Sequence, residues 1–200
     1  MSMEPEFVES IKIKDGKAVG VSYHQARMSR TIQHLFPEKP IPNLEEALSP
    51  TPAMHFHKAR VIYNAQGIND IQYTPYAMRK INSLKIIKDD NICYPFKSTD
   101  RSRLNMLSAK KEECDEIIIM KQGLVTDTSF TNIAILEGRK WITPRHPLLP
   151  GTKRAYLLEA GLMEEADITF CRLMKAEKVC LFNAMIELSE ITLTPLDIST

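Results

Sequence analysis

A lysine that ends an extended stretch directly before a helix can supply an amine for covalent catalysis. Lys97 follows the stretch that starts at Tyr94 and precedes a helix expected from residue 100 to about 114. In most proteins such a lysine is an ordinary surface residue. It becomes a nucleophile where burial or a nearby cation such as Arg101 favours the neutral amine. The position alone therefore leaves a structural and a catalytic role open.

Two later stretches carry groups that suit an anionic or heteroaromatic ligand. The first runs from Gly123 to Asn132 and includes the carboxyl group of Asp127. In the second, Gly151-Thr152 opens an expected helix, and the N-terminus of a helix binds phosphate through its free N–H groups. Taken singly, these stretches are also typical of a polar turn and of a loop before a capped helix.

Together these stretches resemble the class IV aminotransferase family, whose members use pyridoxal 5′-phosphate in the fold called type IV. The family has a lysine before a helix, then Gly-x-x-x-Glu-x-x-x-x-Asn, then Thr-Pro and Leu-Pro-Gly-x-Thr-Arg. That order and spacing are kept from Lys97 to Arg154. Upstream, Glu9-Ser-Ile is similar to the family's Glu-Thr-Ile strand, and His24-x-x-Arg27 is similar to its His-x-x-Arg helix. The resemblance covers nearly the whole chain.

The resemblance implies a role for each matching residue. Lys97 would hold the cofactor aldehyde as an imine and move protons at the substrate's α-carbon. Asp127 would pair with the ring nitrogen, where most relatives have glutamate. Lys153 replaces a hydroxyl residue of the relatives, and Ala184 stands where serine or threonine is frequent. The implied cofactor-binding residues are Arg27, Lys97, Asp127, Thr131, Asn132, Gly151, Thr152, Asn183 and Ala184.

Two reactions are compatible with this cofactor, 4-amino-4-deoxychorismate lysis and amino-acid transamination. Lyases of the family carry a hydroxyl residue on the first strand that can protonate the leaving group, and Ser10 falls at that position. Ser10 therefore favours the lyase, which releases pyruvate and 4-aminobenzoate, a folate precursor. A branched-chain or D-amino-acid transaminase and a non-catalytic cofactor-binding relative are the alternatives. Arg60 and Arg103 are candidates for holding a substrate carboxylate.

The composition and the remaining motifs indicate no further class of partner or cofactor. With a net charge of +1 and 44% hydrophobic residues, it indicates neither nucleic acid nor a membrane as partner. Residues 1–9 lack the pattern of a signal peptide, so we expect a cytoplasmic protein. The four cysteines form no C-x-x-C pair and are expected to be reduced and mostly buried. His55-x-His57 lacks a third ligand nearby, so no metal site is predicted.

The elements that must position these residues are strands and helices mixed without a strict βαβ rhythm, which indicates a mixed α/β (α+β) fold. The resemblance implies the two-domain fold of D-amino-acid aminotransferase, with a small domain over residues 1–90 and a cofactor domain carrying the lysine over 91–200. Helices are expected over 23–36, capped by Ser22, and over 44–48, 100–114 and 152–160. Strands are expected over 7–13, 59–63, 70–76, 83–87, 116–120, 124–127, 132–136, 168–171 and 179–182.

The resemblance also implies an assembly. The chain begins at the strand of Glu9, without the hairpin that precedes it in longer relatives. We therefore expect a pocket that is more open or is completed by a partner subunit. Because the family is usually dimeric with the active site near the interface, a homodimer that binds a small amino-acid-like substrate is expected.

Overall fold

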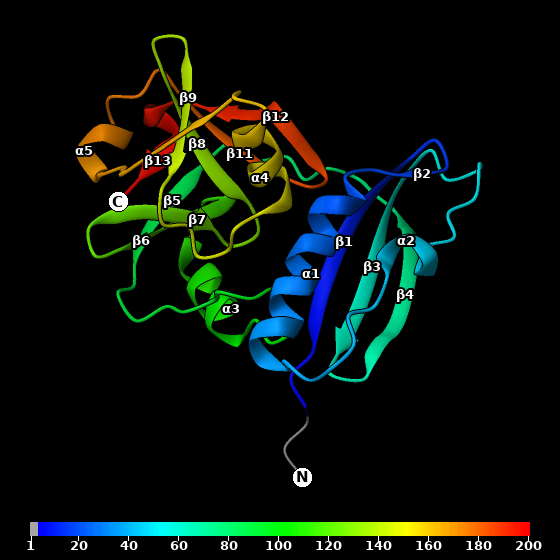
Figure 1. The fold of residues 1–200 in the computed structure, drawn as a ribbon. Helices are drawn as coiled ribbons and strands as arrows, with labels where there is room; N and C mark the ends of the chain where they lie inside the picture. The colour runs from blue at the N-terminus through cyan, green and yellow to red at the C-terminus, as the bar shows by residue number, and fades with distance from the viewer. Residues whose placement is uncertain (1–3) are drawn as a thin grey trace. The chain divides into compact units, whose positions relative to one another are not determined.

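The computed structural model describes residues 4–200, and the chain divides into two compact units (Figure 1). The first unit comprises the chain up to Ala77 together with Phe96–Asp100. The second comprises Met78–Pro95 and Arg101–Thr200. Residues 1–3 lie outside the described residues. They are part of the stretch 1–9, in which no signal peptide was expected. None of the described helices is long and apolar enough to cross a membrane.

The first unit is a four-stranded antiparallel sheet in the order β2-β1-β3-β4. Strand β1 pairs in register with β3 along its whole length. Neighbouring side chains of each strand point to opposite faces, and Phe7, Ile11 and Ile13 lie on the face that packs against α1. The elements of this unit are β1 (Phe7–Lys14), β2 (Lys17–Ala18), α1 (Val21–Leu35), α2 (Leu44–Ala47), β3 (Phe56–Asn64) and β4 (Gly67–Pro75).

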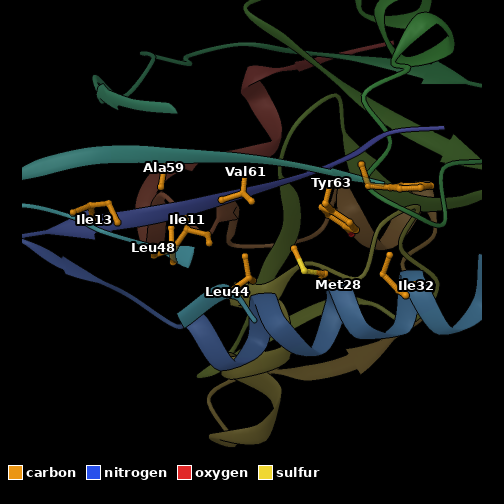
Figure 2. Packing of buried hydrophobic residues seen from close by; sticks show 10 residues of the cluster. Ile11, Ile13, Met28, Ile32, Leu44, Leu48, Ala59, Val61 and Tyr63 are labelled. Carbon is orange, nitrogen blue, oxygen red and sulfur yellow. The ribbon is translucent and has the colours of Figure 1, made fainter. Parts of the chain in front are cut away.

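Helix α1 and the sheet enclose the core of this unit (Figure 2). Met28 and Ile32 are one turn apart on α1 and meet Val61 and Tyr63 of β3. The helix begins after Gly20, whose left-handed φ of 67° suits glycine, and no side chain caps its first turn. The cap predicted at Ser22 is therefore wrong, because Ser22 lies inside the helix.

The second unit contains a mixed sheet in the order β10-β9-β8-β7-β6-β5-β13, with β11 pairing β8 and β12. Its strands are β5 (Leu84–Lys88), β6 (Glu116–Lys121), β7 (Leu124–Thr128), β8 (Asn132–Glu137), β9 (Lys140–Pro144), β10 (Glu164–Ala166), β11 (Lys178–Asn183), β12 (Ile186–Leu193) and β13 (Ile198–Ser199). Its helices are α3 (Ser102–Ser108), α4 (Thr152–Glu159) and α5 (Phe170–Leu173), with 3₁₀ turns η1 (Ala109–Lys111) and η2 (Pro195–Asp197).

Some local predictions were wrong. The strand expected over 168–171 is reduced to a single bridge between Thr169 and Leu124, and α5 begins at Phe170. The Thr169 side chain accepts a hydrogen bond from Arg172 N and so caps this helix. The helix expected to reach residue 114 ends earlier, and Glu112 has a positive φ of 53°. Five strands, β2, β9, β10, β12 and β13, were not predicted. All four thiols are free, but only Cys180 is buried, while Cys93 and Cys171 are exposed.

The division of the chain differs from the predicted boundary at residue 90. Strand β5 pairs in parallel with β6, so the chain from Met78 onward belongs with the second unit. The segment Phe96–Asp100 belongs with the first unit, since the Lys97 carbonyl accepts a hydrogen bond from Val8 N at 2.8 Å. The lysine expected in the cofactor domain is therefore part of the smaller unit.

Candidate active site

Lys97 sits on a short segment that pairs with the start of β1. Phe7 and Ser98 form an antiparallel bridge, which places Lys97 opposite Val8. Residues opposite one another in an antiparallel pair share a face of the sheet. Since Phe7 faces α1, Val8 and Lys97 belong to the other face, and Ser10 follows on that face two residues along β1. The register therefore brings Lys97 and Ser10 to the same side of the sheet.

On the α1 side of β1, a buried acid holds two residues of the helix. The Glu9 carboxylate accepts hydrogen bonds from Arg27 Nε at 2.9 Å and Arg27 Nη2 at 2.5 Å, and His24 Nδ1 lies 2.6 Å from Glu9 Oε2. Glu9 is fully buried, and His24 and Arg27 are nearly so. The predicted shared helix face of His24 and Arg27 is thus built around Glu9, whose role as counter-ion the sequence did not reveal.

The charges of this cluster follow from its contacts. Burial by itself raises the pKa of Glu9, but the Arg27 guanidinium and the hydrogen bonds from His24 and Arg27 lower it to about 2. Burial lowers the pKa of His24, and Glu9 opposes that change. The Glu9–Arg27 ion pair is therefore maintained at neutral pH and orients the plane of the guanidinium.

In the second unit, Asp127 and Asn132 form a pair across the turn between β7 and β8. Asn132 Nδ2 donates to Asp127 Oδ1 at 2.7 Å, and Leu149 N donates to Asp127 Oδ2 at 3.0 Å. Asn132 Nδ2 also lies 3.0 Å from the Leu149 carbonyl. Burial raises the pKa of Asp127 to about 7, although these donors oppose the change. Asp127 is therefore a buried acid held by neutral donors.

Gly151 is the residue that lets α4 approach this pair. A Cβ atom at Gly151 would lie 1.9 Å from Asn132 Oδ1, so no larger residue fits there without moving Asn132. Thr152 begins α4 directly beside it. The adjacent Lys153 points to Glu187, whose carboxylate lies 2.6 Å from the Lys153 ammonium. The structure thus places the N-terminus of α4 next to the Asp127–Asn132 pair.

Other predicted cofactor residues shape the turns around this group. Thr131 Oγ1 lies 2.7 Å from Thr128 Oγ1, within the β7–β8 turn. The Asn183 carboxamide oxygen accepts two backbone hydrogen bonds of its own turn, at 2.8 and 3.1 Å, and its nitrogen donates to Phe130 O. Ala184 follows in the same turn, between β11 and β12. These side chains fix the backbone near Asp127.

The two arginines proposed for a substrate carboxylate have different surroundings. Arg103 donates from Nε to Asp89 Oδ2 at 2.7 Å, and its Nη2 lies 2.6 Å from the same atom. Arg60 lies on β3 directly opposite Ser10. The predicted residues thus form two groups. By register, Lys97, Ser10 and Arg60 belong to one sheet face of the first unit and Arg27 to the other. The Lys97 charge lowers the pKa of His24, so the lysine acts electrostatically on the Arg27 group as well. The second unit carries the group around Asp127. Among the described residues, no cluster of three metal-ligating side chains occurs.

The fold, with a lysine before a helix in one unit and a buried acid beside a helix N-terminus in the other, is that of the pyridoxal-phosphate enzymes of fold type IV. The model of the amino-transferase class IV family matches residues 6–193. The chain belongs to this family, which comprises pyridoxal-phosphate-dependent aminotransferases and lyases.

Individual relatives agree with that assignment. An uncharacterised protein of Haemophilus influenzae is 35% identical over 187 residues, which are 92% of this chain and 98% of the relative. A solved structure described as a "putative 4-amino-4-deoxychorismate lyase" from Haemophilus somnus 129pt has 35% identity and a TM-score of 0.84, covering 94% of this chain and 100% of the other. Aminodeoxychorismate lyase of Saccharomyces cerevisiae is 38% identical over 80 residues, only 36% of this chain and 21% of that enzyme.

Proposed function

We propose that this protein is a 4-amino-4-deoxychorismate lyase, which splits its substrate into 4-aminobenzoate and pyruvate. The observation that carries the proposal is the register that puts Ser10 on the same sheet face as Lys97. A lyase needs an acid for the departing enolpyruvyl group as well as a base for the carbon that bears the substrate's amine. A lysine and a serine on one sheet face can supply both, whereas a transaminase has no leaving group to protonate.

The buried residues of the second unit fit pyridoxal phosphate. Asp127 is a buried carboxyl group whose hydrogen-bond donors are neutral, and the Arg154 charge acts on it more weakly than they do. A protonated ring nitrogen would supply a positive charge in direct contact with it. The narrow approach at Gly151 sets the N–H groups at the start of α4 beside that acid, where they suit a phosphate. When bound, the cofactor supplies an aldehyde for linkage to a lysine and a ring that accepts an electron pair.

The chain's own residues would then perform the proton transfers. The Lys97 amine would bind the cofactor covalently and remove the proton from the substrate carbon that carries the amine. The Ser10 hydroxyl would give a proton to the enolpyruvyl group as its bond to the ring breaks, and the ring becomes aromatic. Arg27, oriented by Glu9, would add positive charge for the phosphate.

The assembly and location are part of the same proposal. We infer a homodimer, which the family resemblance supports, and molar mass in solution at a range of concentrations tests it. A cytoplasmic location is supported by four unpaired thiols, two of them exposed, because exposed thiols persist in a reducing compartment.

The test is conversion of aminodeoxychorismate by the purified, cofactor-loaded protein, measured as 4-aminobenzoate formed. Borohydride should fix the cofactor on the peptide containing Lys97. Ser10→Ala should lower turnover about 100-fold or more and leave the bound cofactor's absorbance unchanged. The exposed Ser22, inside α1, provides the matched control Ser22→Ala.

Three results would contradict the proposal. Bleaching of the cofactor's colour by glutamate, without formation of 4-aminobenzoate, would indicate a transaminase. A colourless protein that takes up no added cofactor would indicate a non-catalytic relative. Equal turnover in the Ser10→Ala and Ser22→Ala variants would show that Ser10 takes no part in the reaction.

A further inference from the structure

The sheet face that carries Lys97 also carries a group of cations that the cofactor chemistry does not use. Side chains alternate along β1 and β3, so Lys12 and Lys14 share this face with Lys58 and Arg60. The register places Lys12 directly opposite Lys58, and Arg60 directly opposite Ser10. We call Lys12, Lys58 and Arg60 the basic face; Lys14 lies beyond them at the exposed end of β1.

The inner cations of the basic face lie close together. Opposite residues of an antiparallel pair have Cβ atoms about 5 Å apart, and residues two apart on one strand are separated by roughly 7 Å. Like charges placed directly opposite, as at Lys12 and Lys58, destabilise a sheet. Lys12 lies 5.7 Å from the centre of the Phe56 ring and is only 6% exposed. The strands therefore hold positive charge at the centre of the sheet rather than at its rim.

Acidic side chains of this unit do little to neutralise Lys58 and Arg60. On β4, Gln72 lies opposite Arg60 and Thr74 opposite Lys58, and both are uncharged. Asp70, on the same face, lies opposite Ile62, and its carboxylate accepts a hydrogen bond from Gln72 at 2.7 Å. Within residues 4–200, no ion pair is formed by Lys58 or Arg60. Lys58 and Arg60 therefore supply positive charge that an anionic ligand would balance.

We propose that the basic face is a receptor for the two carboxylates of a dianionic substrate, with Arg60 binding one and the Lys12–Lys58 pair the other. The inference rests on the proposed lyase function. Arg60 adjoins Ser10, the proposed acid, so it takes the carboxylate of the departing enolpyruvyl group. The ring carboxylate lies across the ring from the amine, and it reaches the lysine pair further along the strands.

The burial of Lys12 indicates what size of ligand the basic face accepts. An extended polyanion binds through exposed cations that track its backbone, whereas Lys12 is almost completely covered and Lys58 and Arg60 are partly covered. A carboxylate at the edge of a small molecule can enter among such side chains. The same face presents Lys97, so a bound dianion would lie beside the reactive amine.

Binding of chorismate to the cofactor-loaded protein tests the receptor without turnover. Chorismate has both carboxylates but a hydroxyl group where aminodeoxychorismate has its amine, so it cannot react with the cofactor. Lys58→Met and Arg60→Met should each raise its dissociation constant about tenfold or more, because each removes a charged hydrogen bond. Lys14→Met, at the exposed end of the same face, is the matched control and should change it less than twofold.

A single-carboxylate probe separates the two positions. 4-Hydroxybenzoate carries only the ring carboxylate, so its binding should weaken in Lys58→Met and stay within about twofold in Arg60→Met. The charge-conserving variants Lys58→Arg and Arg60→Lys should bind chorismate within about threefold of the parent, which excludes misfolding as the cause. Chorismate affinity unchanged in both methionine variants would overturn the receptor.

Failure of the receptor and failure of the lyase function give different results. The receptor is supported and the lyase function is contradicted if the parent protein forms no 4-aminobenzoate but both methionine variants bind chorismate more weakly than the parent. The lyase function is supported and the receptor is contradicted if both methionine variants convert aminodeoxychorismate with the KM of the parent protein.

Discussion

The Asp89 carboxylate and the Arg103 guanidinium close the stretch of chain that contains Lys97, with Arg103 Nε 2.7 Å from Asp89 Oδ2. Both residues belong to the second unit, while Phe96–Asp100 between them belongs to the first. The ion pair thus joins the chain just before it leaves the second unit to the chain just after it returns. It lowers the pKa of Asp89 through the hydrogen bond from Arg103.

Arg103→Met should therefore loosen the segment that carries Lys97. We expect cofactor affinity to fall about two- to tenfold, because Lys97 is held less firmly in position. Arg103→Lys should retain most of the cofactor affinity. Titration of the apoprotein with pyridoxal phosphate, followed by absorbance, measures the effect. Arg139→Met, in the exposed β8–β9 turn, is the control. Equal affinity in Arg103→Met and Arg139→Met would exclude a positioning role.

Asp127 should make the stability of the apoprotein fall as pH rises. Its native pKa is about 7, while the unfolded chain loses the proton near the ordinary aspartate pKa of 3.8. Between these values the native state holds more protons, so stability decreases across that interval, by up to about 4 kcal/mol. Urea unfolding from pH 4.5 to 8 measures this, and Asp127→Asn should remove the slope. An identical slope in both proteins would rule out Asp127 as its source.

Glu9 should have the opposite pH dependence. Its native pKa of about 2 lies below the ordinary glutamate pKa of 4.5, so its contribution to stability is complete above pH 4.5 and is lost as pH falls toward 2. That contribution is about 3 kcal/mol. Glu9→Gln leaves Arg27 buried without its carboxylate and should cost roughly 3–5 kcal/mol at pH 7. Acid unfolding with and without the substitution checks both values. The control Glu38→Gln, at an exposed carboxyl group of the same unit, should change neither.

Gly151→Ala should separate Asn132 from Asp127. The added Cβ would lie 1.9 Å from Asn132 Oδ1, so the amide must move and the hydrogen bond to Asp127 is lost. We expect a loss of about 1–3 kcal/mol in unfolding free energy and weaker cofactor binding. Adding Asn132→Ser removes the clash and should restore part of the stability but not the cofactor affinity. A single variant with unchanged stability and affinity would contradict this account.

Much of the family assignment came from the order of short motifs. Lys97, Asp127, Asn132 and Gly151 are recognisable because their types and spacing are visible along the chain, and the family and fold class inferred from them are confirmed. Most strands of the two sheets were also predictable, since alternation of apolar residues is a local pattern. The helix at Phe170–Leu173 was missed because one cap at Thr169 outweighs strand propensity there.

Pairings between distant residues were decided only by tertiary structure. The sequence by itself determined which residue types are available, with a lysine before a helix and a carboxyl before a turn. It could not show that Lys97 joins the first unit beside Val8, some ninety residues earlier, nor that Glu9 is the buried counter-ion of Arg27. Strand register and burial set these relationships, because both depend on the summed packing of many side chains rather than on any local sequence pattern.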